Sequence, residues 1–214
     1  MGRVPAVSDL DQAGVATRAQ LPALGLAPGL IRQQVRSGRW QVLHVGVYAT
    51  FSGPVPTMSR VWAALLRAGP GAVAGPRTSL WLAGATDRPP DQLDVTIPEH
   101  RRVRGRHPFR VLRRQALASA AHPAARPPRL RIEEAVLDAA DETDRAVVVV
   151  DLVIAAVQRR LTTAARLRDA LARRRGHRWR TLLTEILADV SSGVRNETPR
   201  PKQKLVIKSE NARE

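Results

Sequence analysis

The chain has 214 residues, with 35 Lys and Arg against 19 Asp and Glu, which gives a formal net charge of +16. The absence of cysteine excludes disulfides, thiol catalysis and cysteine-based metal sites. No apolar run approaches the roughly 20 residues of a membrane-spanning helix, and the first residues lack the apolar core of a signal peptide. We therefore expect a cytoplasmic protein that does not engage membranes, and the charge favours nucleic acid or an acidic protein as its partner.

The positive charge is unevenly distributed along the chain. Residues 101–131 contain ten Arg and no acidic residue, whereas residues 1–56 contain five Arg and two Asp. Arginine at this density would neutralise phosphate charge without regard to base sequence. The alternative interpretation of residues 101–131 is a solvated, arginine-rich loop.

The N-terminal segment predicts three short helices and a β-hairpin. Each helix is expected to open at a capping or first-turn residue and to close at a glycine: Ser8 to Gly14, Thr17 to Gly25, and Pro28 to Gly38. The β-branched and aromatic residues of 39–48 then predict a hairpin with its turn near residues 44–46. This order of elements is that of a winged helix-turn-helix, which we assign to residues 1–52.

The third helix has two chemically different faces. Its helical spacing directs Leu30, Ile31 and Val35 inward. The outward residues are then Arg32, Gln33 and Arg36, and Arg and Gln are the side chains that read guanine and adenine edges in a major groove. Arg39, which opens the hairpin, is expected to contact phosphate. Two alternatives stay open: these are ordinary surface residues, or the winged helix binds protein.

Residues 53–195 predict a mixed domain with a short β-sheet and a helical C-terminal half, so the fold class is α+β. Helices are expected at 58–68 and 77–82, and strands at 92–98 and 109–114. A basic loop, 99–108, joins the strands and offers four candidate phosphate contacts: Arg101, Arg102, Arg104 and Arg106. Four further helices are expected at 132–140, 144–160, 163–174 and 178–192, with Asp144 and Thr162 as caps.

No catalytic or metal site is expected. Asp94, Glu99 and His100 lie close in sequence, but strand alternation directs Asp94 outward and no third group completes a triad. The five histidines are scattered without metal-ligand spacing. We therefore predict no enzymatic activity, no metal and no cofactor.

Three segments together resemble the N-terminal domain of AbiEi-type antitoxins, the antitoxin half of type IV toxin–antitoxin systems. They are residues 14–21 (GVATRAQL), 25–38 (GLAPGLIRQQVRSG) and 46–48 (GVY). The strands at 92–98 and 109–114 with their arginine-rich link resemble antitoxin-like actinobacterial proteins. The resemblance implies double-stranded DNA as a partner, autorepression of the promoter, and neutralisation of a nucleotidyltransferase-like toxin.

The last residues differ in composition from the rest. In many such relatives a sequence like residues 190–195 leads into a domain resembling very-short-patch-repair endonucleases. Here all three Lys and both Asn of the chain fall within 196–214, which we expect to be a disordered tail, and the nuclease carboxylates have no counterpart. We hypothesise that a frameshift, deletion or insertion replaced the continuation.

The alternatives to a DNA-binding antitoxin are a truncated, non-catalytic relative of the antitoxin–endonuclease fusion and a protein–protein adaptor.

Overall fold

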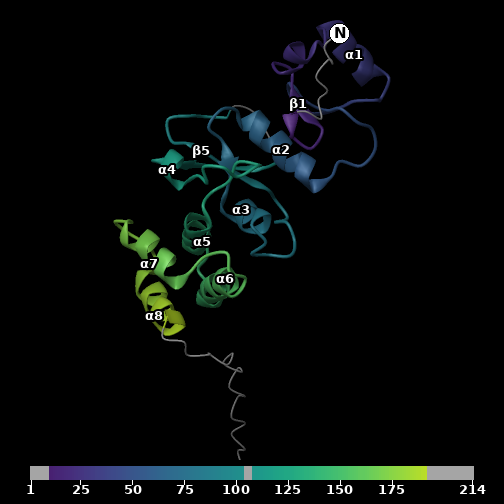
Figure 1. Cartoon of the computed structure of the whole chain (residues 1–214). Coiled ribbons are helices and arrows are strands. Elements are labelled where there is room, and N and C mark those ends of the chain that lie inside the picture. Colours follow the sequence, from purple (N-terminus) through teal and green to yellow (C-terminus); the bar gives the residue numbers. More distant parts are fainter. Residues whose placement is uncertain (1–9, 104–107, 192–214) are drawn as a thin grey trace, which may run out of the picture.

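The computed structural model describes residues 10–103 and 108–191, and within them the protein is an α+β fold. Figure 1 shows the N-terminal elements at one end, a small sheet in the middle and a group of helices at the other end. The expected α+β class is therefore confirmed. Arg104, Arg106, the Ser8 cap and the tail 196–214 lie outside the described residues.

The N-terminal part is a three-stranded antiparallel sheet with two short helical segments. The sheet has the order β1-β3-β2, and a 3₁₀ turn and α1 lie between β1 and β2 in the chain. The elements are β1 (Val15–Thr17), the 3₁₀ turn (Leu21–Leu24), α1 (Pro28–Arg36), β2 (Gln41–His44) and β3 (Val47–Ala49). The predicted hairpin and third helix are thus present.

The first two predicted helices are wrong in their extent. Val15–Thr17, expected to link two helices, instead pair with residues 47–49 as a third strand, a long-range contact that no local pattern announces. Thr17 ends this strand, and its Oγ1 accepts a hydrogen bond from the Gln20 backbone N–H at 3.2 Å. The second helix is therefore reduced to one 3₁₀ turn, which Gly25 closes in a left-handed conformation with φ 76°.

Helix α2 (Thr57–Ala68) joins this sheet to the middle of the molecule. One hydrophobic core contains Val15 and Val47 of the N-terminal sheet together with Val61 and Trp62 of α2 and buried residues of the central sheet. The Ser59 hydroxyl also donates to the Ala13 carbonyl oxygen at 2.8 Å. The hydrophobic core therefore crosses the boundary expected at residue 52.

The central sheet has the order β4-β5-β6, with β5 antiparallel to β4 and parallel to β6. Its strands are β4 (Val73–Ala74), β5 (Asp94–Pro98) and β6 (Arg110–Arg114), and α3 (Pro76–Leu82) lies between β4 and β5 in the chain. Residues 94–97 are all buried, so β5 is covered on both faces and its alternation does not mark a solvent side.

Asp94 is therefore not directed outward, as the alternation predicted, but is 1% exposed. Its carboxylate accepts hydrogen bonds from the backbone N–H groups of Arg77 and Thr78, at 3.1 and 2.8 Å, in the first turn of α3. A carboxylate at this place compensates the unpaired N–H groups and the partial positive charge of a helix start. Asp94 thus has a structural role in joining β5 to α3.

The C-terminal half is helical, as predicted, with its own core around α5. Its helices are α4 (Leu117–Ala120), α5 (Ile132–Asp141), α6 (Ala146–Gln158), α7 (Ala164–Ala172) and α8 (Arg180–Ser191). Two predicted caps are wrong. Arg145 rather than Asp144 precedes α6, and Thr163 rather than Thr162 caps α7 through the Arg166 N–H. Within the described residues no helix is both long and apolar enough to cross a membrane.

Candidate nucleic-acid interface

Helix α1 is anchored by one residue and exposes a polar face. Ile31 is 5% exposed and packs in a small core with Ala16, Leu21 and Leu24. Three residues that follow it on the helix are exposed, as predicted: Arg32, Gln33 and Arg36. The inward face is narrower than expected, because Leu30 is 36% exposed and Val35 is only half-buried. The outer surface of α1 is therefore larger than the periodicity predicts.

The hairpin adds a second exposed element beside α1. Arg39 is exposed and lies two residues before β2, and the Trp40 N–H donates to the Gln34 carbonyl oxygen of α1 at 3.1 Å. Val45 at the turn is 83% exposed. Gln41, in contrast, is not available to a ligand, since its side-chain amide donates to the carbonyl oxygens of Phe51 and Gly53 at 3.1 and 2.9 Å.

The exposed surface of α1 and the hairpin lies in a long stretch of the chain that has no acidic residue. Residues 12–86 contain seven Arg and no Asp or Glu. Among the described residues, no carboxylate pairs with the side chains of Arg32, Arg36 or Arg39. Within the described part of the chain, the charge of these guanidinium groups is therefore not compensated by neighbouring carboxylates.

The two described arginines of the basic loop, Arg101 and Arg102, differ in their surroundings. Arg102 is exposed. Arg101 is half-buried, and its guanidinium donates to the carbonyl oxygens of Ala68, at 2.9 Å, and Pro70. It thus satisfies backbone acceptors at the C-terminal end of α2. The structure assigns Arg101 to this helix end and leaves fewer of its donors for phosphate than the sequence predicts.

Several of the remaining arginines of 101–131 make internal contacts. Arg110 lies 3.2 Å from the Asp94 carboxylate and 2.7 Å from that of Glu142. Arg126 bonds Asp11 and the Leu10 carbonyl oxygen, and its guanidinium lies 5.5 Å from the centroid of a Trp62 ring. These contacts join segments far apart in sequence. Among the described residues, part of the positive charge of 101–131 is therefore paired with carboxylates inside the fold.

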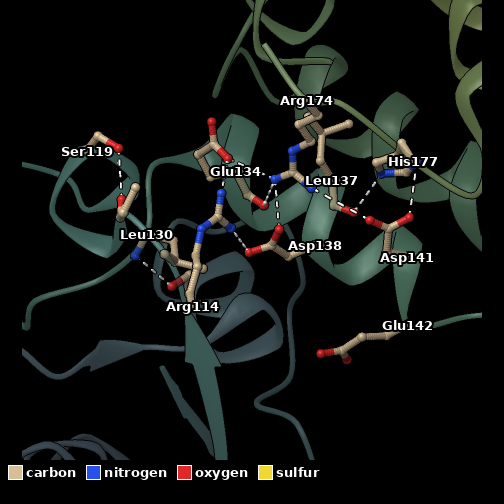
Figure 2. A network of polar contacts seen from close by, with 12 residues as sticks. Arg114, Ser119, Leu130, Glu134, Leu137, Asp138, Asp141, Glu142, Arg174 and His177 are labelled. Carbon is tan, nitrogen blue, oxygen red and sulfur yellow. Dashed lines mark hydrogen bonds and ion pairs between the residues drawn. The ribbon is translucent and has the colours of Figure 1, made fainter. Parts of the chain in front are cut away.

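Several ion pairs form one network on α5, which Figure 2 shows. Glu134 and Asp138, one turn apart on α5, are both bridged by Arg114 of β6 and by Arg174, which follows α7. Arg174 lies 2.8 Å from Glu134 and 2.7 Å from Asp138, and its side chain is only 15% exposed. The network fastens the central sheet and the end of α7 to α5.

The protonation state of Glu134 reflects this network. Burial alone would raise the pKa of the Glu134 carboxyl, but the guanidinium groups of Arg174 and Arg114 outweigh burial and lower that pKa below its ordinary value. His177 extends the contacts, with Nε2 3.0 Å from the Leu137 carbonyl oxygen and Nδ1 3.2 Å from Asp141. Sequence reasoning missed this network because its members come from β6, α5 and the segment after α7.

The described residues offer no group of three or more His, Asp or Glu side chains that could hold a metal ion. Glu99 and His100 are exposed, whereas Asp94 is buried against α3. Asp94 therefore lies in the interior, whereas Glu99 and His100 lie at the surface, and the three side chains do not share one environment.

Comparison with known proteins bears on the fold. No family model matches the chain, and a search of curated proteins finds no match. The chain is similar to the crystal structure of the RV2827C protein from Mycobacterium tuberculosis, with a TM-score of 0.52 and 21% identity. The likeness covers 87% of this chain and 77% of that one. At this identity it shows a shared fold alone.

Proposed function

We propose that the protein is a DNA-binding transcriptional regulator in which α1 enters the major groove. The observation that carries the proposal is the exposed face of Arg32, Gln33 and Arg36 on a helix anchored by Ile31, within a 75-residue stretch free of acidic residues. Arg can donate two hydrogen bonds to guanine, and Gln can pair with adenine, at major-groove edges. The resulting contacts would depend on base sequence.

The hairpin suits a supporting role in this arrangement. A short helix followed by a hairpin is the core of the winged-helix order, and we assign β2 and β3 as the wing. Arg39 at the base of the wing and Arg102 in the basic loop are exposed cations suited to phosphate. Contacts of this kind fix the position of a protein on the duplex without reading sequence.

The cellular role is proposed on the resemblance of residues 14–48 to AbiEi-type antitoxins. On that basis the protein represses its own promoter, neutralises a nucleotidyltransferase-like toxin and is not itself an enzyme. A toxin gene of that class adjacent to this gene, whose product co-purifies with the protein, would support the role. An isolated gene would leave DNA binding intact as a function and remove the toxin as a partner.

The decisive experiment is a salt-dependent binding measurement by fluorescence anisotropy. The full chain is titrated onto a duplex from its own upstream region and onto a shuffled duplex of equal length and composition, from 50 to 300 mM salt. We expect tighter binding to the upstream duplex at every salt concentration, with both affinities falling as salt increases, because phosphate contacts release counterions. Equal affinity for the two duplexes would exclude sequence-specific regulation.

A further inference from the structure

A hollow of about 770 Å³ lies between the segment that precedes α5 and helix α7. It belongs to the C-terminal helical half, which Figure 1 places at the opposite end of the molecule from α1. Its size falls within the roughly 300–1,000 Å³ of small-molecule sites. The hollow is therefore separate from the proposed DNA-binding surface.

Four arginines line this hollow, and they come from separate segments. Arg129 and Arg131 precede α5, Arg166 lies in the first turn of α7, and Arg173 directly follows α7. Arg166 and Arg173 are exposed at the rim. The fold thus brings together cations that are more than 30 residues apart in sequence.

Arg129 differs from Arg166 and Arg173 in its burial. It is half-buried, and among the residues that the structure describes no acceptor bonds its guanidinium. Burial lowers the pKa of Arg129, with no opposing contribution from a carboxylate. Because this guanidinium has no protein acceptor among the described residues and is not fully buried, its donors are available to an anion in the hollow.

Among the described contacts, the carboxylates that line the hollow do not accept hydrogen bonds from Arg129. Glu134 is bridged by Arg114 and Arg174 and lies 3.8 Å from Arg173 at the rim, and the Glu133 carboxylate accepts a hydrogen bond from the Thr162 hydroxyl at 2.6 Å. Asp169 is exposed on α7. Two of the three lining carboxylates are thus engaged by other groups.

The wall of the hollow also carries apolar side chains. Leu130 is buried, and Ile132 and Leu161 are half-buried around it. A ligand with a charged end and a less polar body would match arginines on one part of the surface and aliphatic carbon on another.

We propose that this hollow binds a phosphate-bearing small molecule of about the size of a mononucleotide. Guanidinium groups match phosphate because their planar N–H pairs can donate to two of its oxygens at once. In this arrangement Arg129 contacts the phosphate from the segment before α5, and Arg166 and Arg173 contact it from the two ends of α7. A concave site of this size receives a small molecule rather than the side of a duplex.

The test uses the full chain and ATP as the probe, with binding measured by isothermal titration calorimetry at low salt. We expect saturable binding at one site. Arg129→Gln and Arg166→Gln should each weaken it by about tenfold, the typical effect of losing one charge-assisted contact. Arg168→Gln is the matched control, because Arg168 is exposed on the same helix and does not line the hollow. The exposed position of Arg166 keeps the test valid if Arg129→Gln fails to fold.

Competition experiments separate the sources of the anion. Inorganic phosphate should displace ATP, and citrate should do so poorly. Equal displacement by citrate would show a general anion site and overturn the proposal. Displacement by a short duplex, lost again when Arg166 is replaced, would assign the hollow to DNA and also overturn it. The double variant Arg32→Ala/Arg36→Ala should retain ATP binding, so the two proposals fail independently.

Discussion

Two arginine-containing regions of this chain behave in opposite ways. Residues 12–86 contain seven Arg in 75 positions without any acid, and those on α1 and at the start of the hairpin are exposed and unpaired within the described structure. Residues 101–131 contain ten Arg in 31 positions, yet Arg110, Arg114 and Arg126 pair with carboxylates drawn from elsewhere in the chain. Within the described residues, carboxylates thus pair with three arginines of the denser region but with none of Arg32, Arg36 and Arg39.

The difference shows that the charge of a segment and the charge of a surface are separate quantities. An arginine next to a carboxylate from another element contributes to cohesion of the fold and little to attraction of a polyanion. An arginine in a region without carboxylates contributes to the potential outside the molecule. Substitutions in the two regions should therefore change different properties, namely stability in one and DNA binding in the other.

The largest effect should come from breaking the ionic network. Arg174→Ala removes one partner from Glu134 and Asp138, whose side chains are 11% and 22% exposed, and leaves Arg114 as the guanidinium that bridges both. We expect a loss of about 3 kcal/mol in the free energy of unfolding, because breaking a buried ion pair costs more than its net contribution. Urea denaturation measures it. Arg175→Ala, at the exposed neighbouring position, is the control and should be close to wild type.

The second-largest effect should be a loss of DNA affinity without a loss of stability. Arg32→Ala combined with Arg36→Ala should lower the affinity for the upstream duplex by about 100-fold, since each base-reading arginine contributes about 1–3 kcal/mol, and preference over a shuffled duplex should disappear. The melting temperature should stay unchanged, because both side chains are exposed. Arg168→Ala combined with Arg175→Ala removes the same charge from the far end. If this control loses the preference equally, α1 does not read the bases.

The pH dependence of stability should isolate Glu134. Its pKa is lower in the folded protein than its ordinary value of 4.5, so its ionised form stabilises the fold. This contribution is complete above about pH 4.5 and is lost as the pH falls through the lowered folded-state pKa. In urea denaturation between pH 6 and pH 3, the difference between wild type and Glu134→Gln should shrink with falling pH. A difference that stays constant would place the stabilisation elsewhere.

A smaller effect should appear in the salt dependence of DNA binding. Arg39→Gln should reduce the slope of log K against log salt by about 0.9, the value for one phosphate contact. Arg110→Gln should leave the slope unchanged, because Arg110 is bound to Asp94 and Glu142. Anisotropy titrations at four salt concentrations distinguish the two. A reduced slope for Arg110→Gln would contradict the division between paired and unpaired arginines.

The smallest effect is expected at an exposed ion pair. Asp87 lies 2.8 Å from Arg159, but its side chain is 81% exposed. The hydrogen bond and the charge of Arg159 lower the pKa of Asp87, yet solvent screens such a pair strongly. Asp87→Asn should produce no measurable change in melting temperature by calorimetry. A clear decrease would show that exposed pairs also stabilise this fold.

Local sequence patterns predicted most of the elements but few of the contacts between them. Helices α1, α2, α3 and α5–α8 and the hairpin follow from apolar spacing, proline and glycine. The strand at Val15–Thr17 was missed because three residues carry too little alternation and its partner lies about 30 positions away. The exposed residues of α1 could be predicted, since they depend on one helix alone. The pairing of Arg114 and Arg174 could not, because it depends on the packing of three separate segments.

The shared core beneath the hairpin has an evolutionary consequence. Val15 and Val47 are 0% and 2% exposed because they pack with residues of α2 and of the central sheet. A recombination event that exchanged only residues 1–52 would leave this apolar surface facing an unmatched helix. We therefore expect the proposed DNA specificity to change more readily by point substitutions at Arg32, Gln33 and Arg36 than by exchange of whole N-terminal units, and a functional chimera to need its junction beyond the central sheet, which shares this core.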